Sequence, residues 1–329
     1  MVGATEITES NVAYTHEQHS GLVCVFAGAT AGIGRATLER LATMLHSSTF
    51  YILGRNKQRH APWLEQLRAS SSNSKFVYVE AQVSLISDID KACNQILSAE
   101  PKVDILCMSP GGMPFAGAKY TEEGLETCFA VSYYSRLRMV SNLLPLLNQC
   151  QDHPAHVLSI LNGTKETKID EDDLNLDKNW GIRAVVNHTT LLTSLSFDYL
   201  AAQSPQGHIV FLHATPGFVN TNTPRTKEHL PSREKVGLLQ WAFISFVQVV
   251  SGWVIRYFGM NIKESGERHA YHLTSDRFKP GSWRVDRHCE VVPDNDVLKD
   301  YQSRGWTEKA WNFTLATWDK VLGNAGPAH

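Results

Sequence analysis

The sequence LVCVFAGATAGIGR, residues 22–35, joins a short apolar run to a glycine-rich turn. The run Leu22–Ala27 has the length and apolar content of a strand that is buried on both faces, as in parallel sheets. In the turn, Gly28 permits a tight bend, Gly32 lets the backbone approach a pyrophosphate, and Gly34 allows a helix to pack closely on the strand. The start of that helix would present free N–H groups to the phosphates. The stretch therefore predicts a dinucleotide-binding site at the first strand–helix junction.

The following part of the chain repeats this alternation of strand and helix. Further strands are predicted at residues 49–53, 76–79, 102–108, 156–161 and 208–213, and helices at residues 35–45, 87–99, 121–147 and 183–202. Strands that alternate with helices through short turns predict an α/β fold with a doubly wound, Rossmann-type parallel sheet. We expect residues 1–20 to form a polar N-terminal arm and residues 21–329 to form one domain.

Beyond Thr221 this regularity stops. The segment VGLLQWAFISFVQVVSGWVI, residues 236–255, contains no charged residue, and its length leaves three interpretations open. It predicts an apolar helical insertion over residues 222–262 that covers the substrate, but peripheral membrane contact or a spanning helix would also suit it. Residues 279–329 are expected to form a C-terminal extension with a helix packed on the outside of the domain.

The composition excludes several classes of protein. Of 329 residues 43% are apolar, which suffices for a sizeable core, and 31 basic against 33 acidic residues leave no positive excess for nucleic acid. The six cysteines form no CxxC pair, which favours reduced thiols in a reducing compartment. The first residues carry no secretory pattern, so a cytoplasmic location is expected. The acidic run DEDD, residues 170–173, lacks calcium-loop spacing, and no metal is expected.

The turn spacing GxxxGIG, together with later motifs, resembles the short-chain dehydrogenase/reductase superfamily over about residues 21–221 and again near residues 265–278. DILCMSPG, residues 104–111, occupies the place of that superfamily's DxLxNNAG, and PGFVNT, residues 216–221, looks like its PGxxxT segment, which closes over the nicotinamide. YYSR, NLLPLL, Lys165-Glu166 and SGERH are similar to motifs of fungal members often found near natural-product pathways. The implied cofactor contacts are Gly28, Thr30, Gly32, Ile33, Gly34, Arg55, Gln82, Val83, Gly111, Pro216, Gly217, Val219 and Thr221.

The choice of cofactor depends on the end of the second strand. A site selective for NAD places a carboxylate there, which accepts hydrogen bonds from the ribose hydroxyls. In this sequence Gly54 fills that place and Arg55 follows it. A guanidinium suits a 2′-phosphate, so NADP(H) is predicted, although Arg55 could also be a solvated loop charge.

The resemblance also implies a catalytic set of Asn, Ser, Tyr and Lys, and this sequence departs from it at each position. Ser132 stands in the place of the Asn, and Leu161-Asn162-Gly163 replaces the Ser. In one register the Tyr and Lys positions hold Gly181 and Val185, and in the other they hold Trp180 and Ala184. Neither register supplies a phenol or an ammonium group.

Proton transfer would therefore need other residues. His188 shares the helix face that would have carried the Tyr and Lys, and imidazole titrates in the physiological range. Lys165 follows the fifth strand, where ligands bind in such sheets, and the Asn162 amide can orient a substrate oxygen. A buried packing role for His188 and a solvated Lys165 are the alternatives. Further candidates are Tyr133 and Tyr134, followed by Ser109 and Thr215.

The leading prediction is an NADP(H)-dependent oxidoreductase of the short-chain dehydrogenase type with a non-standard catalytic set. It would act on the carbonyl, alcohol or activated C=C of a small hydrophobic metabolite, in secondary metabolism. The alternatives are a non-redox isomerase or cyclase on the same fold and a catalytically silent binding protein. A homodimer is expected by analogy with the family only.

Overall fold

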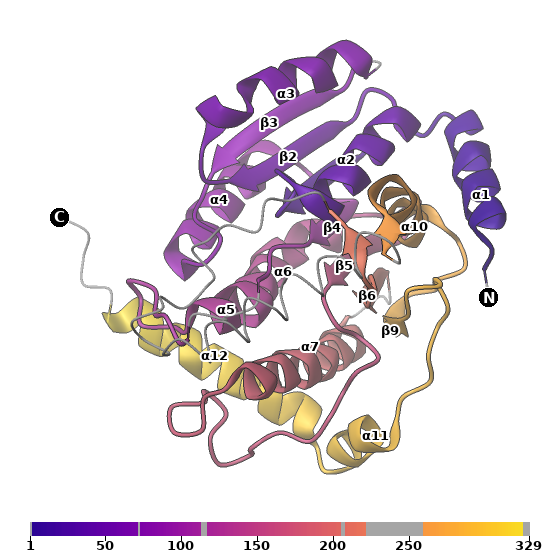
Figure 1. Ribbon diagram of the computed structural model, residues 1–329. Coiled ribbons are helices and arrows are strands. Elements are labelled where there is room, and N and C mark those ends of the chain that lie inside the picture. Colours follow the sequence, from indigo (N-terminus) through magenta and orange to yellow (C-terminus); the bar gives the residue numbers. More distant parts are fainter. Residues whose placement is uncertain (1, 72, 113–116, 205–207, 222–258, 325–329) are drawn as a thin grey trace, which may run out of the picture.

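The computed structural model describes residues 2–71, 73–112, 117–204, 208–221 and 259–324. In these residues a seven-stranded sheet, in the order β3-β2-β1-β4-β5-β6-β9, lies between two layers of helices (Figure 1). All its strand pairs are parallel. The strands are β1 (Val23–Ala27), β2 (Thr49–Gly54), β3 (Lys75–Glu80), β4 (Ile105–Met108), β5 (Ala155–Ile160), β6 (Ile209–Ala214) and β9 (Gly281–Val285). The predicted α/β, Rossmann-type sheet is confirmed.

The central strands form because their residues are apolar on both sides. Every residue of β1, β4, β5 and β6 is buried. Alternate side chains of β1 enter different cores: Val23 and Val25 pack on one face, and Cys24 and Phe26 pack on the other. The strand order reverses between β1 and β4, which is the point where ligands bind in sheets of this kind.

Two helical layers cover the sheet. The apolar side chains on one face pack with α2 (Gly32–Met44), α3 (Lys57–Ser70) and α10 (Ile262–Thr274). Those on the other face pack with α4 (Ile86–Ala99), α6 (Ser135–Leu147) and α7 (Ile182–Gln203). The long helix predicted over residues 121–147 begins only at Thr127, with α5 (Thr127–Phe129) and a π-helical turn, η1 (Ala130–Tyr134), before α6. Outside the sheet, β7 (Val219–Asn220) pairs with β8 (Met260–Asn261).

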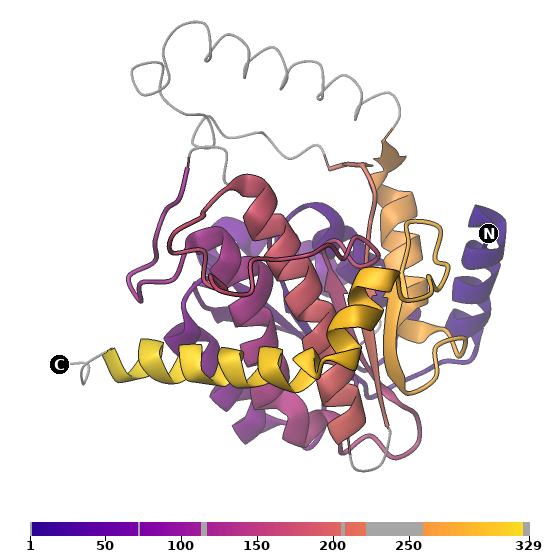
Figure 2. The ribbon, with the colours of Figure 1, turned by 90° about the horizontal axis from the view of Figure 1, so that it is seen from below.

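The C-terminal extension is built into the domain. Strand β9 pairs in parallel with β6, from Val210 opposite Gly281 to Ala214 opposite Val285, and adds a seventh strand that the sequence analysis missed. After α11 (Asp296–Ser303), helix α12 (Trp306–Asn324) lies across α7 (Figure 2). Its Trp318 is 1% exposed and belongs to the main core. The expected outer helix is therefore present, and it closes the core.

The N-terminal segment is a packed helix where the sequence predicted a polar arm. Helix α1 (Ala4–His16) stands beside α10 (Figure 1), and its Ile7 and Asn11 are buried. The Asn11 amide donates to the backbone oxygen and to the carboxylate of Glu267, at 2.9 and 2.7 Å. Arg40 of α2 donates to the same carboxylate at 2.8 Å. Only a thin buried stripe anchors this helix, so the sequence carries little periodic signal for it.

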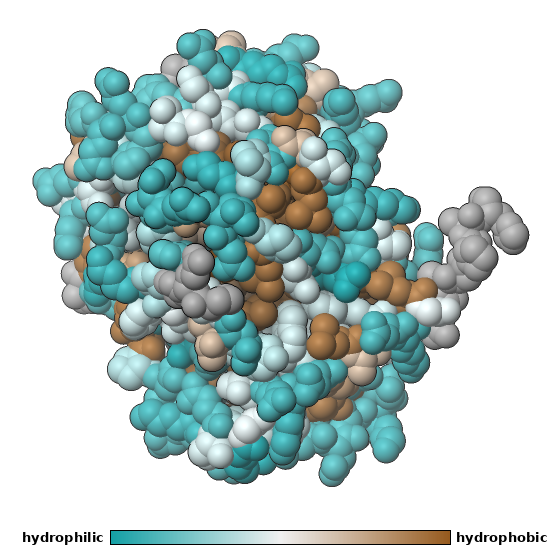
Figure 3. Space-filling model, turned by 180° about the vertical axis from the view of Figure 1, so that it is seen from behind, coloured by the Kyte–Doolittle hydropathy of each residue, from teal (hydrophilic) through white to brown (hydrophobic). Residues whose placement is uncertain are grey.

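The predicted apolar segment, residues 236–255, lies outside the described residues. Among the residues that the structure does describe, no helix is long and apolar enough to cross a membrane. The face opposite to that of Figure 1 is mainly hydrophilic, with small and interrupted apolar areas (Figure 3).

We expect Trp318→Ala to lower the free energy of unfolding by about 3–5 kcal/mol, because a buried indole is replaced by a cavity under α12. Trp318 packs edge-to-face on Trp311 and lies under the Arg138 guanidinium, so the cavity would also cost these contacts. Urea denaturation measures the loss. Leu315 on the same helix is 38% exposed, and Leu315→Ala should cost less than about 1 kcal/mol. Equal losses in the two variants would contradict the proposed role of α12 in the core.

Candidate cofactor and active site

The glycine turn after β1 is packed directly against the end of β4. Gly28 has φ +81°, and a Cβ atom there would lie 2.5 Å from the backbone nitrogen of Pro110. A Cβ atom on Gly34 would lie 2.8 Å from the Gly28 oxygen and would overlap Ser109. The Ser109 hydroxyl donates to the oxygen of Gly28 at 3.1 Å. A residue with a Cβ atom therefore does not fit at either glycine without a shift of its neighbours. The Ser109 hydroxyl, a minor candidate for proton transfer in the sequence analysis, is instead hydrogen-bonded to the turn.

Helix α2 begins at Gly32, immediately after this turn. Its N-cap residue, Ala31, offers no side-chain hydrogen bond, and the first turn of the helix contains no acidic residue. The N–H groups at this end are thus not capped by a side chain within the described part of the chain. Thr30 and Ile33 are half-buried beside them. The arrangement suits an anionic group such as a pyrophosphate.

The end of β2 has no room for a carboxylate. A Cβ atom on Gly54 would lie 2.9 Å from the ring carbon Cζ of Tyr78 and 3.0 Å from a methyl group of Thr30. The Tyr78 hydroxyl accepts a long hydrogen bond from the Asn56 N–H, and the His60 ring stacks on Tyr78. Next to this packed corner Arg55 is exposed. A side chain at position 54 would therefore collide with Tyr78 unless that ring moved, and Arg55 follows at the surface.

The neighbouring strand end would border the adenine. Gln82 and Val83 follow β3, where Gln82 is exposed and Val83 half-buried. The Gln82 N–H donates to the Asp88 carboxylate at 3.0 Å, which fixes the backbone and leaves the Gln82 side chain at the surface. The contact of Gln82 with the adenine stays a prediction.

The ends of β4 and β5 are joined by one buried side chain, Arg136 of α6. Its guanidinium donates to the Met108 and Ile160 oxygens, each at 3.1 Å, and to the Ser159 hydroxyl at 2.7 Å. It also donates to the oxygens of Val131 and Pro110. Arg136 is 1% exposed, and burial lowers its pKa to about 9, so it remains a cation at neutral pH. The sequence analysis did not identify it, because only the folded chain brings these acceptors together.

The ends of β5 and β6 are held together by backbone contacts. The Leu161 N–H donates to the Ala214 oxygen at 2.9 Å, and the Thr215 hydroxyl donates to the oxygen of Gly163. A Cβ atom on Gly163 would lie 2.5 Å from the carbonyl carbon of His213. The segment that holds Pro216, Gly217, Val219 and Thr221 thus starts beside the loop that holds Asn162.

Asn162 lies half-buried at this edge, against helix α7. Its amide donates to the Thr190 hydroxyl at 3.3 Å, and Thr190 donates to the oxygen of Val186. The helix face that meets Asn162 therefore carries Val186 and Thr190. Lys165 is exposed, and its N–H closes a turn on the Asn162 oxygen at 3.2 Å. The structure thus places Asn162 and Lys165 together at the carboxyl edge of the sheet, as the sequence analysis expected.

His188 lies elsewhere on α7. Its Nε2 accepts from the Asp170 N–H at 3.1 Å, and its Nδ1 faces the Leu174 oxygen at 3.2 Å, which requires a proton on Nδ1. Burial lowers the pKa of this histidine, so the neutral ring fits both contacts. Both ring nitrogens are thus committed to the loop over residues 170–174. This geometry does not support the predicted catalytic role of His188 and indicates that it ties the loop to the helix.

The two tyrosines considered as alternatives are also committed to packing. The Tyr133 hydroxyl contacts Ser196 and Thr314 at 3.0 and 2.6 Å, and burial raises its pKa to about 12. The Tyr134 hydroxyl donates to the Asn175 side chain at 2.8 Å. Neither phenol reaches the strand ends at which Asn162 lies.

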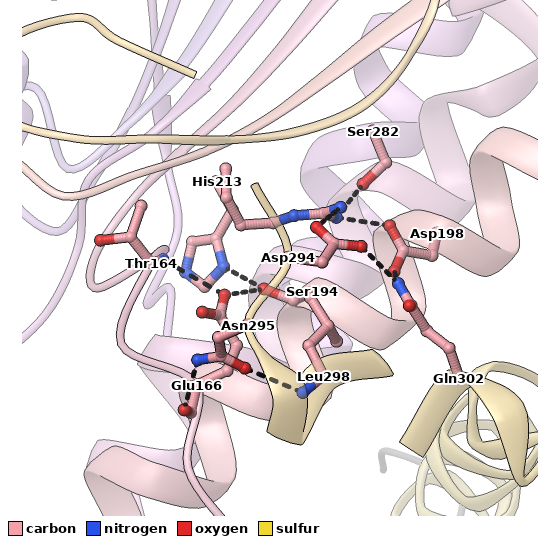
Figure 4. Close-up of polar contacts among 11 residues, drawn as sticks. Thr164, Glu166, Ser194, Asp198, His213, Ser282, Asp294, Asn295, Leu298 and Gln302 are labelled. Atoms are coloured by element: carbon pink, nitrogen blue, oxygen red, sulfur yellow. Dashed lines mark hydrogen bonds and ion pairs between the residues drawn. The ribbon is translucent and has the colours of Figure 1, made fainter. Parts of the chain in front are cut away.

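A buried polar chain lies beneath the loop after β5 (Figure 4). Ser194 of α7 donates to the Glu166 carboxylate at 2.6 Å, so its oxygen accepts from Nδ1 of His213 at 2.9 Å. Glu166 also accepts from the Thr164 N–H, and its backbone oxygen accepts from Asn295 at 2.9 Å. Burial, together with the charges of Arg136 and Arg284, lowers the pKa of His213 to about 3. The chain fixes the loop over residues 162–166 from below.

The same layer continues into the C-terminal segment. Arg284 of β9 pairs with Asp198 of α7 and with Asp294, and the Gln302 amide donates to both carboxylates at 2.8 Å (Figure 4).

The acidic run at residues 170–173 also holds its surroundings through hydrogen bonds. Asp173 accepts three backbone N–H groups, those of Asp177, Lys178 and Asn179. Within the described ranges, no group of side chains could hold a metal ion.

Comparisons with known proteins agree with this geometry. Residues 22–164 match the short chain dehydrogenase family. An oxidoreductase of Emericella nidulans is 32% identical over 92% of this chain and 94% of its own length. The short-chain dehydrogenase/reductase SAT2 of Stachybotrys chartarum is 31% identical over 92% and 94%. Among solved structures, the NADPH-bound carbonyl reductase from chicken fatty liver shares the fold with a TM-score of 0.54 at 14% identity, over 84% of this chain and all of that one.

Buried histidines predict an acid-sensitive fold. Burial lowers the pKa of His156 and His269 to about 4, while an unfolded histidine titrates near about 6.5. The unfolded chain therefore binds more protons below about pH 6.5, and stability present above that pH is lost as the pH falls toward about 4, by about 1.4 kcal/mol per pH unit for each histidine. Thermal midpoints between pH 7.5 and 5 measure this. His213 is a further buried histidine, so His213→Gln should flatten the dependence of the thermal midpoint on pH. His16 is exposed, and His16→Gln should leave that dependence unchanged. Identical slopes in the two variants would contradict the assignment of the acid sensitivity to buried histidines.

Proposed function

Because the chain belongs to the short-chain dehydrogenase/reductase family, we propose that it is an NADP(H)-dependent oxidoreductase whose catalytic set lacks the usual Tyr and Lys. The observation that carries the proposal is the contact between the glycine turn and the end of β4, with the uncapped start of α2 beside it. This is the place where a dinucleotide lies in a doubly wound sheet. A bound nicotinamide would supply or accept the hydride there.

The preference for NADP(H) is supported by the corner between β2 and β3. Gly54 offers no carboxylate that could accept hydrogen bonds from the ribose hydroxyls, and Tyr78 and Thr30 fill the space where a side chain at position 54 would begin. Arg55 is exposed at the same corner and offers a forked, permanently charged partner for a 2′-phosphate. Arg35, by contrast, is already paired with Glu39 at 2.8 Å. We assign the phosphate contact to Arg55.

The non-standard catalytic set is supported by the residues at the start of α7. Positions 180–186 read WGIRAVV, without a phenol or an ammonium group, and the face toward Asn162 carries Val186 and Thr190. We assign to the Asn162 amide the hydrogen bond that orients the substrate oxygen. An amide cannot supply a proton, so the proton comes from water or from the exposed Lys165.

The substrate class follows from the sequence after the sixth strand. The motif PGFVNT leads within fifteen residues to the uncharged segment at residues 236–255, which is suited to covering an apolar molecule. We therefore propose a small hydrophobic metabolite that bears a carbonyl, an alcohol or an activated C=C. A place in secondary metabolism is proposed from the motifs YYSR, NLLPLL and SGERH. Four further points stay predictions: a cytoplasmic location, an absence of nucleic-acid binding, peripheral membrane contact through residues 236–255, and a homodimer.

We expect the protein to bind NADPH at least roughly ten-fold more tightly than NADH, because a charge-assisted hydrogen bond to the 2′-phosphate contributes about 1.5–3 kcal/mol. Fluorescence titration of the two reduced cofactors measures the preference. Arg55→Ala should remove most of it. Arg68→Ala on α3, whose guanidinium donates to the Phe76 oxygen, should leave it unchanged. Equal affinities in the parent, or a preference that survives in Arg55→Ala, would rule out this assignment.

We expect Asn162→Ala to lower the turnover of a hydrophobic ketone by about 10²–10³, the usual cost of losing one donor to a developing oxyanion. The thermal midpoint should change little, since Asn162 is half-buried and its bond to Thr190 is long. Asn187→Ala, also half-buried on α7, is the matched control. Parent-like turnover in Asn162→Ala would place the site elsewhere, and product formed without oxidation of NADPH would favour the isomerase or cyclase alternative.

A further inference from the structure

Arg136 is a buried cation without a carboxylate partner. Its five acceptors within the described residues are four backbone oxygens and the Ser159 hydroxyl, all of them uncharged. The two other arginines that are buried in this part of the chain are both paired, Arg268 with Glu264 and Arg284 with Asp198 and Asp294. Burying a charge is costly unless an opposite charge accompanies it. The missing anion therefore requires an explanation that the side chains of the described residues do not give.

The position of this charge relates it to the candidate site. The guanidinium joins the carboxyl ends of β4 and β5, which lie on the far side of the reversal in strand order from β2 and β3. A dinucleotide that spans the reversal places its adenine half over β2 and β3 and its nicotinamide half over β4 and β5. One guanidinium nitrogen lies 3.9 Å from the place of a Cβ on the exposed Gly111. The charge therefore lies close to the exposed backbone at Gly111.

We propose that the uncompensated charge of Arg136 makes this site bind the reduced cofactor more tightly than the oxidised one. The inference rests on the proposed NADP(H)-dependent function. The nicotinamide ring of NADP⁺ carries a positive charge that the ring of NADPH lacks, so a buried cation beside the ring disfavours the oxidised form. In the direction of reduction the substrate carbon gains a hydride from NADPH, its oxygen gains a proton from water, and NADP⁺ is released.

The same charge also acts on the substrate oxygen. Negative charge develops on the substrate oxygen as the hydride arrives, and a fixed cation in a water-poor site stabilises it without reorganisation. Arg136 acts through space and through the strand ends that it holds, so it is a positioning residue. Two unit charges about 8 Å apart at an effective dielectric constant of about 20 interact strongly enough to change an affinity ten-fold or more.

The test compares the dissociation constants of NADPH and NADP⁺, measured by calorimetric titration without any substrate. We expect the parent to bind NADPH at least roughly ten-fold more tightly than NADP⁺. Arg136→Gln should lower the ratio roughly ten-fold while both cofactors still bind. Arg138→Gln removes a charge from the same helix, but Arg138 is paired with Asp90 at 2.6 Å, so the ratio should not change.

A second variant separates charge from hydrogen bonding. Ser159→Asp places a carboxylate next to the guanidinium, which stands 2.7 Å from the Ser159 hydroxyl, and leaves the backbone contacts of Arg136 in place. It should lower the ratio as Arg136→Gln does, and it decides the question if Arg136→Gln does not fold. A ratio that stays at the parent value in Ser159→Asp, and in Arg136→Gln if that variant folds, would overturn the inference and leave the proposed function standing. Failure of the parent to bind either cofactor would overturn the proposed function, and this inference with it.

Discussion

The close contact between two glycines and the end of β4 is the constraint on which the site depends. Neither Gly28 nor Gly34 has space for a Cβ atom, because Ser109 and Pro110 lie too close. Helix α2 therefore packs directly on the sheet at the point where the strand order reverses. A larger residue at either position would move α2 away from the sheet. The uncapped helix start, the corner at Gly54 and the crevice beside β4 all take their positions from this contact.

Beneath the ends of the strands the sheet carries polar and charged groups where a core of this type usually carries hydrocarbon. Arg136 contacts the Ser159 hydroxyl at the end of β5, and the Ser194 hydroxyl joins the His213 ring to the Glu166 carboxylate. The layer has two consequences. It fixes the loop that holds Asn162 more firmly than apolar packing would, because hydrogen bonds are directional. Within it, Arg136 places a positive charge at the ends of β4 and β5 that does not depend on a lysine in α7.

The fold was largely predictable from the sequence, and the site only in part. The strands of the sheet centre are continuous apolar runs, such as LVCVFA, and the glycine turn has a pattern with a physical cause. Strand β9 was missed because GSWRV contains a serine and an arginine, and the arginine is tolerated only because Asp198 and Asp294 meet it. His188 was expected at the site because helical spacing shows which residues share a face of α7. Spacing does not show which segment packs against that face. Arg136 had no signal, because its acceptors come from three separate segments, at residues 108–110, 131 and 159–160.

The position of α12 across α7 has a consequence for the synthesis of the protein. Strand β9 and helix α12 are made later than all of the elements that they cover. Until they leave the ribosome, the edge of β6 has no parallel neighbour and the apolar side of α7 has no cover. An unpaired strand edge beside an open apolar face is prone to aggregate. The nascent chain therefore passes through a stage in which the half around β1 can already fold while the half around β6 and α7 still exposes an apolar face and an unpaired strand edge.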